Sequence, residues 1–272
     1  MKPVSDEELV RKEKFTFDDC VYILRRLRAP DGCPWDRVQT HESIRINMIE
    51  EAYELVDAID ADDPEKIREE AGDVLMQSLF HTLIEEEAGR FTVEDMLSEL
   101  CKKLVTRHTH VFGQDRASGA EGALSVWDRN KMKEKGQETF SDSVNDVPEV
   151  FPALLRAQKI AKRVSKGGWA KGYPEAEKQL DEEMDEFKRA VKGGNAKEIK
   201  EELGDLLMSI ADIAFILNAD CEEALLDTVK KVQRRYTAYE KAVLADKKEV
   251  NALTDDEKKR YYQRVKDADK KS

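Results

Sequence analysis

The sequence predicts an all-α protein built as a tandem pair of related helical-bundle modules. Charged residues make up 38% of the 272 residues and hydrophobic residues 40%, with only 13 Gly and 7 Pro. Such a composition is typical of soluble helices. Hydrophobic residues also recur at helical spacing, and one acidic helical pattern occurs twice. The length suits two modules, because single domains usually span roughly 100 to 200 residues.

The first module contains a helical hairpin. Hydrophobic residues spaced i, i+3, i+4 and i+7 begin at Ile49, and the helix that they predict ends near Ala61. Asp63-Pro64 then places a capping carboxylate directly before a proline at the first helical position. A second hydrophobic stripe follows up to Gly89, where the next helix is expected to end.

A third helix completes the first module, which is expected to cover residues 1–112. Thr92, with Asp95 three residues later, has the pattern of a capping box and predicts a helix that runs to about His108. Residues 113–152 are rich in glycine and polar side chains. We expect them to connect the modules, with one short helix over residues 125–135.

The second module, residues 153–272, repeats the acidic hairpin of the first. After a predicted helix over 153–165 and a glycine-containing loop, the acidic segments reappear 132 positions later, as Glu183 follows Glu51. The matched runs are Glu50-Glu51-Ala52-Tyr53-Glu54 with Glu182-Glu183-Met184-Asp185-Glu186, and Glu70-Ala71-Gly72-Asp73 with Glu202-Leu203-Gly204-Asp205. One constant offset for both runs points to duplication of one unit.

Each hairpin is expected to gather four carboxylates, because residues three apart on a helix share a face and an antiparallel hairpin brings two such pairs opposite each other. The acids are Glu183, Glu186, Glu202 and Asp205 in the second module and, as a second site, Glu51, Glu54, Glu70 and Asp73 in the first. Two carboxylates ~4 Å apart repel by about 1 kcal/mol in water and about 4 kcal/mol at an effective dielectric of 20. Such a cluster needs a cation, and oxygen ligands alone suit Mg²⁺, with Mn²⁺ as a substitute.

The alternative interpretation of these acids is a solvated helix face, the usual reason for charges on helices. Duplication of both motifs without loss of register favours the metal site. Gly72 and Gly204 stand beside the acids in both copies. A glycine inside a helix costs ~1 kcal/mol relative to alanine, so its repetition here indicates close helix approach or ligand contact.

A pair of basic residues ends each module, Lys103 with Arg107 and Lys231 with Arg235. Their helical spacing lets both members of a pair face one phosphate group, Arg through its bidentate fork and Lys as a point charge. The alternative is that they only complement the negative end of the helix dipole.

Charge and targeting signals exclude several classes of protein. A formal net charge of −12 disfavours binding to nucleic acid. The four cysteines are scattered and form no C-x-x-C pair, and the N-terminus lacks the apolar stretch of a signal peptide. The most hydrophobic stretch, 203–217, contains two aspartates and is too short to span a bilayer. We therefore expect a cytoplasmic protein without a membrane partner.

These motifs, together with several flanking ones, resemble the MazG family over about residues 15–266. The flanking motifs are Cys33-Pro34-Trp35-Asp36, Gln39-Thr40-His41, Arg107-His108-Thr109-His110-Val111-Phe112-Gly113, Val147-Pro148 and Pro152-Ala153-Leu154-Leu155-Arg156-Ala157. The resemblance implies two all-α modules that pair in a homodimer. It also implies the reaction NTP + H₂O → NMP + PPi, carried mainly by the C-terminal module.

The resemblance places the site residues in the second module. It implies a metal site at the four C-terminal acids, phosphate contacts at Lys231 and Arg235, and base stacking on Tyr262. Gln179 stands where relatives commonly have a lysine, beside Glu183 and Asp205 in the expected substrate site. Lys103 and Arg107 are the counterparts in the first module.

The expected mechanism is in-line attack of a metal-activated water on the α-phosphorus, with pyrophosphate leaving. Either Glu182 or Glu186 is expected to accept the proton, and the sequence does not choose between them. His41, His108 and His110 are interpreted as structural or capping residues. Two alternatives stay open: a helical Mg-nucleotide sensor or adaptor without turnover, and a purely structural helical dimer.

Overall fold

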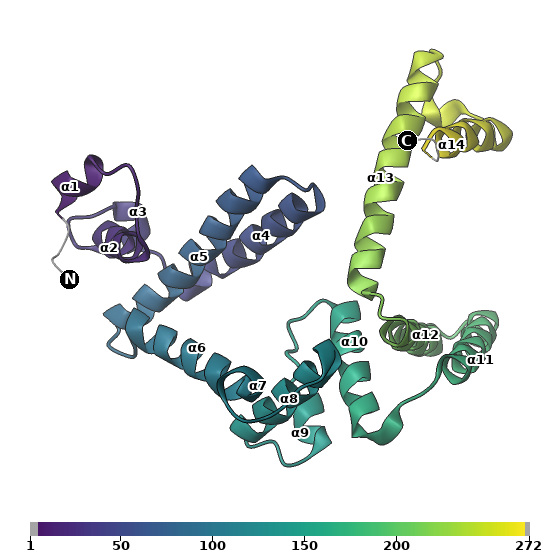
Figure 1. Cartoon of the computed structure of the whole chain (residues 1–272). Helices are drawn as coiled ribbons and strands as arrows, with labels where there is room; N and C mark the ends of the chain where they lie inside the picture. The colour runs from purple at the N-terminus through teal and green to yellow at the C-terminus, as the bar shows by residue number, and fades with distance from the viewer. Residues whose placement is uncertain (1–4, 270–272) are drawn as a thin grey trace. The chain divides into compact units, whose positions relative to one another are not determined.

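The computed structural model describes residues 5–269, and within that range the chain is helical and has no β-strand (Figure 1). The residues form two compact units that divide after Asn130, within helix α8. Helices of the first unit are α1 (Asp6–Val10), α2 (Phe17–Arg28), α3 (Pro34–Arg37), α4 (His41–Asp60), α5 (Pro64–Glu87), α6 (Val93–Arg107), α7 (Thr109–Phe112) and most of α8 (Gly119–Glu134). The all-α prediction with tandem helical modules is confirmed.

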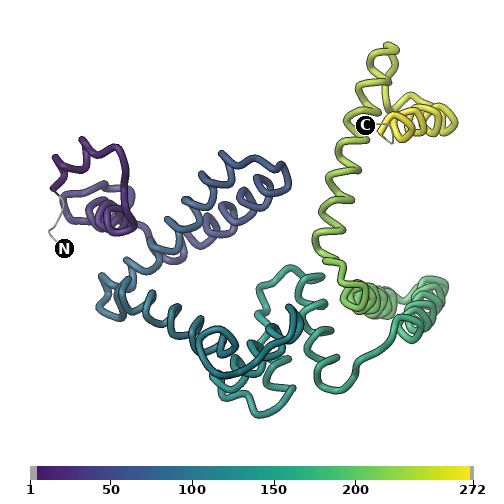
Figure 2. Tube along the Cα trace, in the orientation of Figure 1, coloured from purple at the N-terminus to yellow at the C-terminus, as the bar shows by residue number. Residues whose placement is uncertain are grey.

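The second unit repeats the hairpin of the first, as the Cα trace shows (Figure 2). Its elements are α9 (Phe140–Asn145), α10 (Ala153–Val164), a π-helical turn (Ser165–Trp169), α11 (Tyr173–Gly193), α12 (Ala196–Ile216), α13 (Cys221–Ala245), a 3₁₀ turn (Val250–Ala252) and α14 (Asp255–Asp269). In both units the two hairpin helices pack along each other, α4 with α5 and α11 with α12.

The starts of α5 and α6 form as predicted. The Asp63 carboxylate accepts hydrogen bonds from the backbone N–H groups of Glu65 and Lys66, both at 3.1 Å, and Pro64 occupies the first turn of α5. Thr92 and Asp95 form the reciprocal capping box of α6. These contacts satisfy N–H groups that have no partner inside a helix.

Two boundaries differ from the prediction. The short connecting helix begins at Gly119, six residues before the expected Ser125. Helix α4 begins at His41, because Thr40 and Ser43 cap it ahead of the hydrophobic stripe. Since capping depends on one or two polar residues, a periodicity argument alone does not detect these ends.

The core of the first unit lies where α2 and the start of α4 pack against α5 and α6. Its buried side chains are Val21, Leu24, Ile44, Leu79, Phe80, Leu83 and Val93. Buried Arg28 joins this core to the hairpin through two hydrogen bonds to Glu87, at 2.7 and 2.8 Å. The acid-bearing half of the hairpin extends beyond this core.

In the second unit α10 supports α12, and a separate cluster joins α13 to α14. That cluster consists of Tyr239, Val243, Leu253 and Tyr261, with Tyr262 partly buried against it. Among the described residues, no helix is both long and apolar enough to cross a membrane.

Candidate metal and nucleotide site

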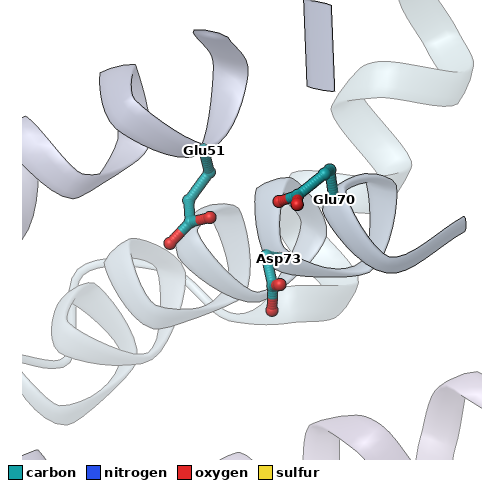
Figure 3. A group of neighbouring side chains, drawn as sticks. All are labelled: Glu51, Glu70 and Asp73. Carbon is teal, nitrogen blue, oxygen red and sulfur yellow. The ribbon is translucent and has the colours of Figure 1, made fainter. Parts of the chain in front are cut away.

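The first hairpin brings three carboxylates together. Glu51 extends from α4, and Glu70 and Asp73 extend from neighbouring α5 (Figure 3). One carboxylate oxygen from each residue lies within 4.8 Å of the other two. The i, i+3 spacing of the two α5 residues puts both on the face that α4 covers.

The second hairpin repeats this cluster with Glu183 from α11 and Glu202 and Asp205 from α12. Their oxygens also lie within 4.8 Å of one another. Glu183 and Glu202 are partly buried, whereas Asp205 is exposed. The structure thus gathers three of the four predicted acids of each module.

The fourth acids stand apart from these groups. Glu186 is exposed and forms a 2.9 Å ion pair with Arg189. Glu54 is exposed on the first hairpin. Both nonetheless act on the clusters electrostatically, since the charge of Glu54 raises the pKa of Glu70 and that of Glu186 raises the pKa of Glu202.

Burial and mutual repulsion make both clusters favourable for a cation. Partial burial is the main reason that the pKa of Glu202 is raised, and the neighbouring carboxylates add to it. The pKa values of Glu51 and Glu70 are raised for the same two reasons. In the first cluster a hydrogen bond with Gln77 opposes part of the rise at Glu51. A group whose charged form is disfavoured in this way gains from a bound cation.

The donor set fits Mg²⁺ or Mn²⁺. Ligand oxygens at about 2.1 Å from Mg²⁺ lie roughly 3 to 4 Å from one another in octahedral geometry. The carboxylate oxygens of each cluster lie within 4.8 Å of one another, close to this range. Two or three carboxylates also leave positions for water and phosphate oxygens.

A family model for the MazG nucleotide pyrophosphohydrolase domain matches residues 39–112 and 174–239, the segments that contain the two acidic hairpins. The chain is 37% identical over 254 residues to the nucleoside triphosphate pyrophosphohydrolase/pyrophosphatase MazG of Thermotoga maritima, with 93% of this chain and 96% of the relative covered. It belongs to the MazG family. The nucleoside triphosphate pyrophosphohydrolase of Escherichia coli is 35% identical over 255 residues, which cover 92% of this chain and 96% of that protein.

A further relative matches over a shorter length. The nucleoside triphosphate pyrophosphohydrolase of Mycolicibacterium smegmatis is 40% identical over 152 residues, which cover 55% of this chain and 46% of that protein. The family resemblance inferred from the motifs is therefore confirmed, and both acidic hairpins lie inside the matched MazG segments.

Three of the four predicted basic residues have other contacts in the single chain. The Nε group of Arg235 donates a 2.7 Å hydrogen bond to Asp269 of α14. Arg107 lies over the indole ring of Trp127, 5.4 Å from its centroid, and Lys103 pairs with Glu99 at 3.4 Å. Lys231 lies one helical turn before Arg235 on α13. Phosphate binding at Arg235 would therefore compete with Asp269.

Tyr262 packs in a hydrophobic cluster, whereas Gln179 contacts the acidic cluster. Tyr262 packs edge-on against Tyr239 with ring centroids 6.4 Å apart, in the cluster that holds α14 to α13. The Gln179 side chain instead contacts the acidic cluster, donating a 3.4 Å hydrogen bond to Glu183. Glu182, the other candidate base, pairs with Lys178 at 3.2 Å.

His41 makes structural contacts. Its ring stacks on that of His81 with centroids 5.0 Å apart, and its Nε2 atom lies 2.5 Å from Glu85.

The two glycines beside the acids have open space around them. Side chains added at Gly72 or Gly204 would meet no atom within 4 Å. Close helix approach among the described residues therefore does not explain these two glycines.

Sequence reasoning did not find Gln77, Lys171 or Asp212 as neighbours of the site. Gln77 is buried and hydrogen-bonds with Glu51. Lys171 contacts both Gln179 and Asp212. Gln77 and Asp212 are polar residues within hydrophobic helical stripes, and Lys171 lies in a loop. Polarity at these positions does not identify a partner.

Proposed function

We propose that this chain hydrolyses nucleoside triphosphates to nucleoside monophosphate and pyrophosphate, with Mg²⁺ held at the acidic hairpin of the second module. The observation that carries the proposal is the three-carboxylate cluster of Glu183, Glu202 and Asp205 within a MazG segment. The named activity of the Thermotoga and Escherichia relatives supports the same reaction. Free nucleotides suit this acidic chain better than nucleic acid, because the metal brings compensating charge with the substrate.

In this proposal Glu183, Glu202 and Asp205 hold the metal, and Glu186 turns from Arg189 to complete the set. Bound Mg²⁺ would supply charge that polarises phosphate oxygens and lowers the pKa of an attacking water. Glu182 or Glu186 accepts the proton of that water. Lys231 and Arg235 stabilise the negative charge of the leaving pyrophosphate, Arg235 by exchanging Asp269 for phosphate.

The proposal includes a homodimer. Large hydrophobic side chains on the hairpins and on α13 stay open to solvent in the single chain, with Ile49 50%, Val56 48%, Leu207 43% and Val232 52% exposed. Exposed hydrophobic stripes of this length mark interaction surfaces. Because both modules expose the same kind of stripe, a second copy of the chain provides matching surfaces for both.

The test is to incubate the purified protein with each nucleoside triphosphate and Mg²⁺ and to separate the products. We expect monophosphate and pyrophosphate in equal amounts, and no products in EDTA. Diphosphate with orthophosphate would assign a different nucleotidase. Binding without turnover would support the nucleotide sensor instead.

A further inference from the structure

A chain of polar contacts leads from α12, through the loop before α11, to one carboxylate of the second acidic cluster. Asp212 on α12 lies 3.7 Å from the ammonium group of Lys171. Lys171 donates a 2.5 Å hydrogen bond to the carbonyl oxygen of the Gln179 side chain. The amide nitrogen of Gln179 in turn donates to Glu183 at 3.4 Å.

The charges at the two ends fix the orientation of the Gln179 amide. Its oxygen faces an ammonium group and its NH₂ group faces a carboxylate, so both ends are complementary. The flipped amide would point N–H donors at the Lys171 donors and an acceptor oxygen at the Glu183 acceptor. Lys171 and Asp212 are both partly buried, with side chains 32% and 23% exposed, so solvent weakens their attraction less than at an open surface.

The first module orients its corresponding glutamate differently. There Gln77 on α5 hydrogen-bonds with Glu51. The residue 132 positions after Gln77 is Ser209, which is also buried, but whose hydroxyl oxygen has no hydrogen-bond partner among the described residues. A serine side chain is too short to replace the glutamine. In the second module the glutamate is therefore contacted by Gln179, which lies on α11, whereas Ser209 lies on α12.

We propose that Lys171 is a positioning residue of the second metal site: it holds Gln179, and Gln179 holds Glu183 in place to bind the metal. The proposal rests on the proposed function only in taking Glu183 as a metal ligand. Residues that orient a ligand usually change metal affinity or activity about 10- to 100-fold when they are removed.

The test measures Mn²⁺ binding by electron paramagnetic resonance in the full-length chain, without nucleotide. A parent variant with Glu51→Gln and Asp73→Asn removes two ligands of the first site, so that the measured Mn²⁺ binding comes from the second site. In this parent we expect Lys171→Met to weaken Mn²⁺ binding about 10-fold, and Gln179→Leu to do the same. Lys188→Met is the matched control for loss of a lysine, because Lys188 lies exposed on α11, the helix of Gln179, and pairs with Asp185. It should leave Mn²⁺ binding unchanged.

The double variant separates positioning from a general loss of structure. If Lys171 acts through Gln179, the combined Lys171→Met and Gln179→Leu variant binds Mn²⁺ no more weakly than either single variant. Losses that multiply, or a Lys171→Met variant within twofold of the parent, would overturn the proposal. Thermal melting in EDTA verifies that each variant is folded, and Asp212→Asn, which leaves Lys171 and Gln179 in place, should give a smaller loss in the same direction.

The outcomes also distinguish this proposal from the proposed function. A parent that binds no Mn²⁺ contradicts both. In a second outcome, the parent binds Mn²⁺ and Lys171→Met weakens that binding, but the native chain forms no pyrophosphate. This result would support the positioning role and contradict the proposed hydrolysis.

Discussion

Carboxylates that converge within a few ångströms are the residues to which we assign the chemistry of this chain. Burial, and to a lesser extent like charge, raises the pKa of Glu51 and Glu70 in the first hairpin and of Glu202 in the second. The same features that destabilise the metal-free cluster increase its affinity for a divalent cation. Removal of one ligand should therefore harm function without harming the fold.

The variants Glu183→Gln and Asp205→Asn test this separation. Both should reduce hydrolysis at the second site by at least 100-fold, because each removes a metal ligand. Melting temperature in EDTA should stay unchanged or rise slightly, since like charge has been removed. Turnover that survives either substitution contradicts the ligand assignment, and a large fall in melting temperature would assign these residues a structural role.

A pH-dependent contribution to stability is expected at Glu85. Hydrogen bonds from Arg90 and from His41 lower its pKa to about 2, from an ordinary 4.5. Since the carboxylate is more acidic in the folded state, its stabilising effect is complete above about pH 5 and is lost as the pH falls from there toward 2.

Denaturant unfolding between pH 2 and pH 7 measures this contribution. The native chain should lose stability more steeply below pH 5 than the Glu85→Gln variant. Glu13→Gln, at an exposed glutamate, is the control that should keep the native profile. Parallel profiles for the native chain and Glu85→Gln would show that the contacts of Glu85 do not stabilise the fold.

At the level of single residues, the sequence predicted the acids but not the side chains that orient them. The i, i+3 spacing defines a helix face, so the convergence of Glu202 and Asp205 follows from local geometry. Contacts of Lys171 with Asp212 require the loop before α11 to pack on α12. No local pattern encodes that packing, and Lys178, nearer to Gln179 in sequence, pairs with Glu182 instead.

Among the secondary-structure elements, the hairpins were the best predicted. Their helices combine a hydrophobic stripe with a strong start signal, as at Asp63-Pro64. Helix α2 was not predicted, although Thr16 and Asp19 form a capping box at its start. Its position depends on packing of Val21 and Leu24 against α5, which a short segment does not reveal by itself.

Removal of the Asp63 cap should destabilise the first hairpin. Asp63→Ala leaves two N–H groups of α5 without their partner, which costs about 1 kcal/mol. Urea unfolding should register this loss, whereas Asp63→Asn or Asp63→Ser should recover most of it. If Asp63→Ala matched the native chain, the cap would contribute nothing to stability.

For the whole molecule, the exposed hydrophobic stripes predict the assembly state. Light scattering should find a dimer at micromolar concentration. Val232→Glu together with Val229→Glu places charge on an exposed hydrophobic face of α13 and should shift the chain toward monomer. Glu240→Lys, at an exposed polar position of the same helix, should keep the native assembly. A native chain that stays monomeric would refute the homodimer.

The two modules share their acidic ligands but not the residues around them. Glu51 has a neutral glutamine of α5 beside it, whereas Glu183 is contacted by Gln179, which Lys171 contacts in turn. The second module also continues into α14, which carries Tyr262. These differences support unequal roles for two sites that the acids alone would make equivalent.

Paired variants test the central claim most directly, that the second hairpin carries most of the hydrolysis. One variant combines Glu51→Gln with Glu54→Gln, and the other combines Glu183→Gln with Glu186→Gln. Monophosphate and pyrophosphate formed from a nucleoside triphosphate with Mg²⁺ are measured for each under identical conditions. We expect the first variant to keep most of the native rate and the second to lose nearly all of it; the reverse result would place the active site in the first module.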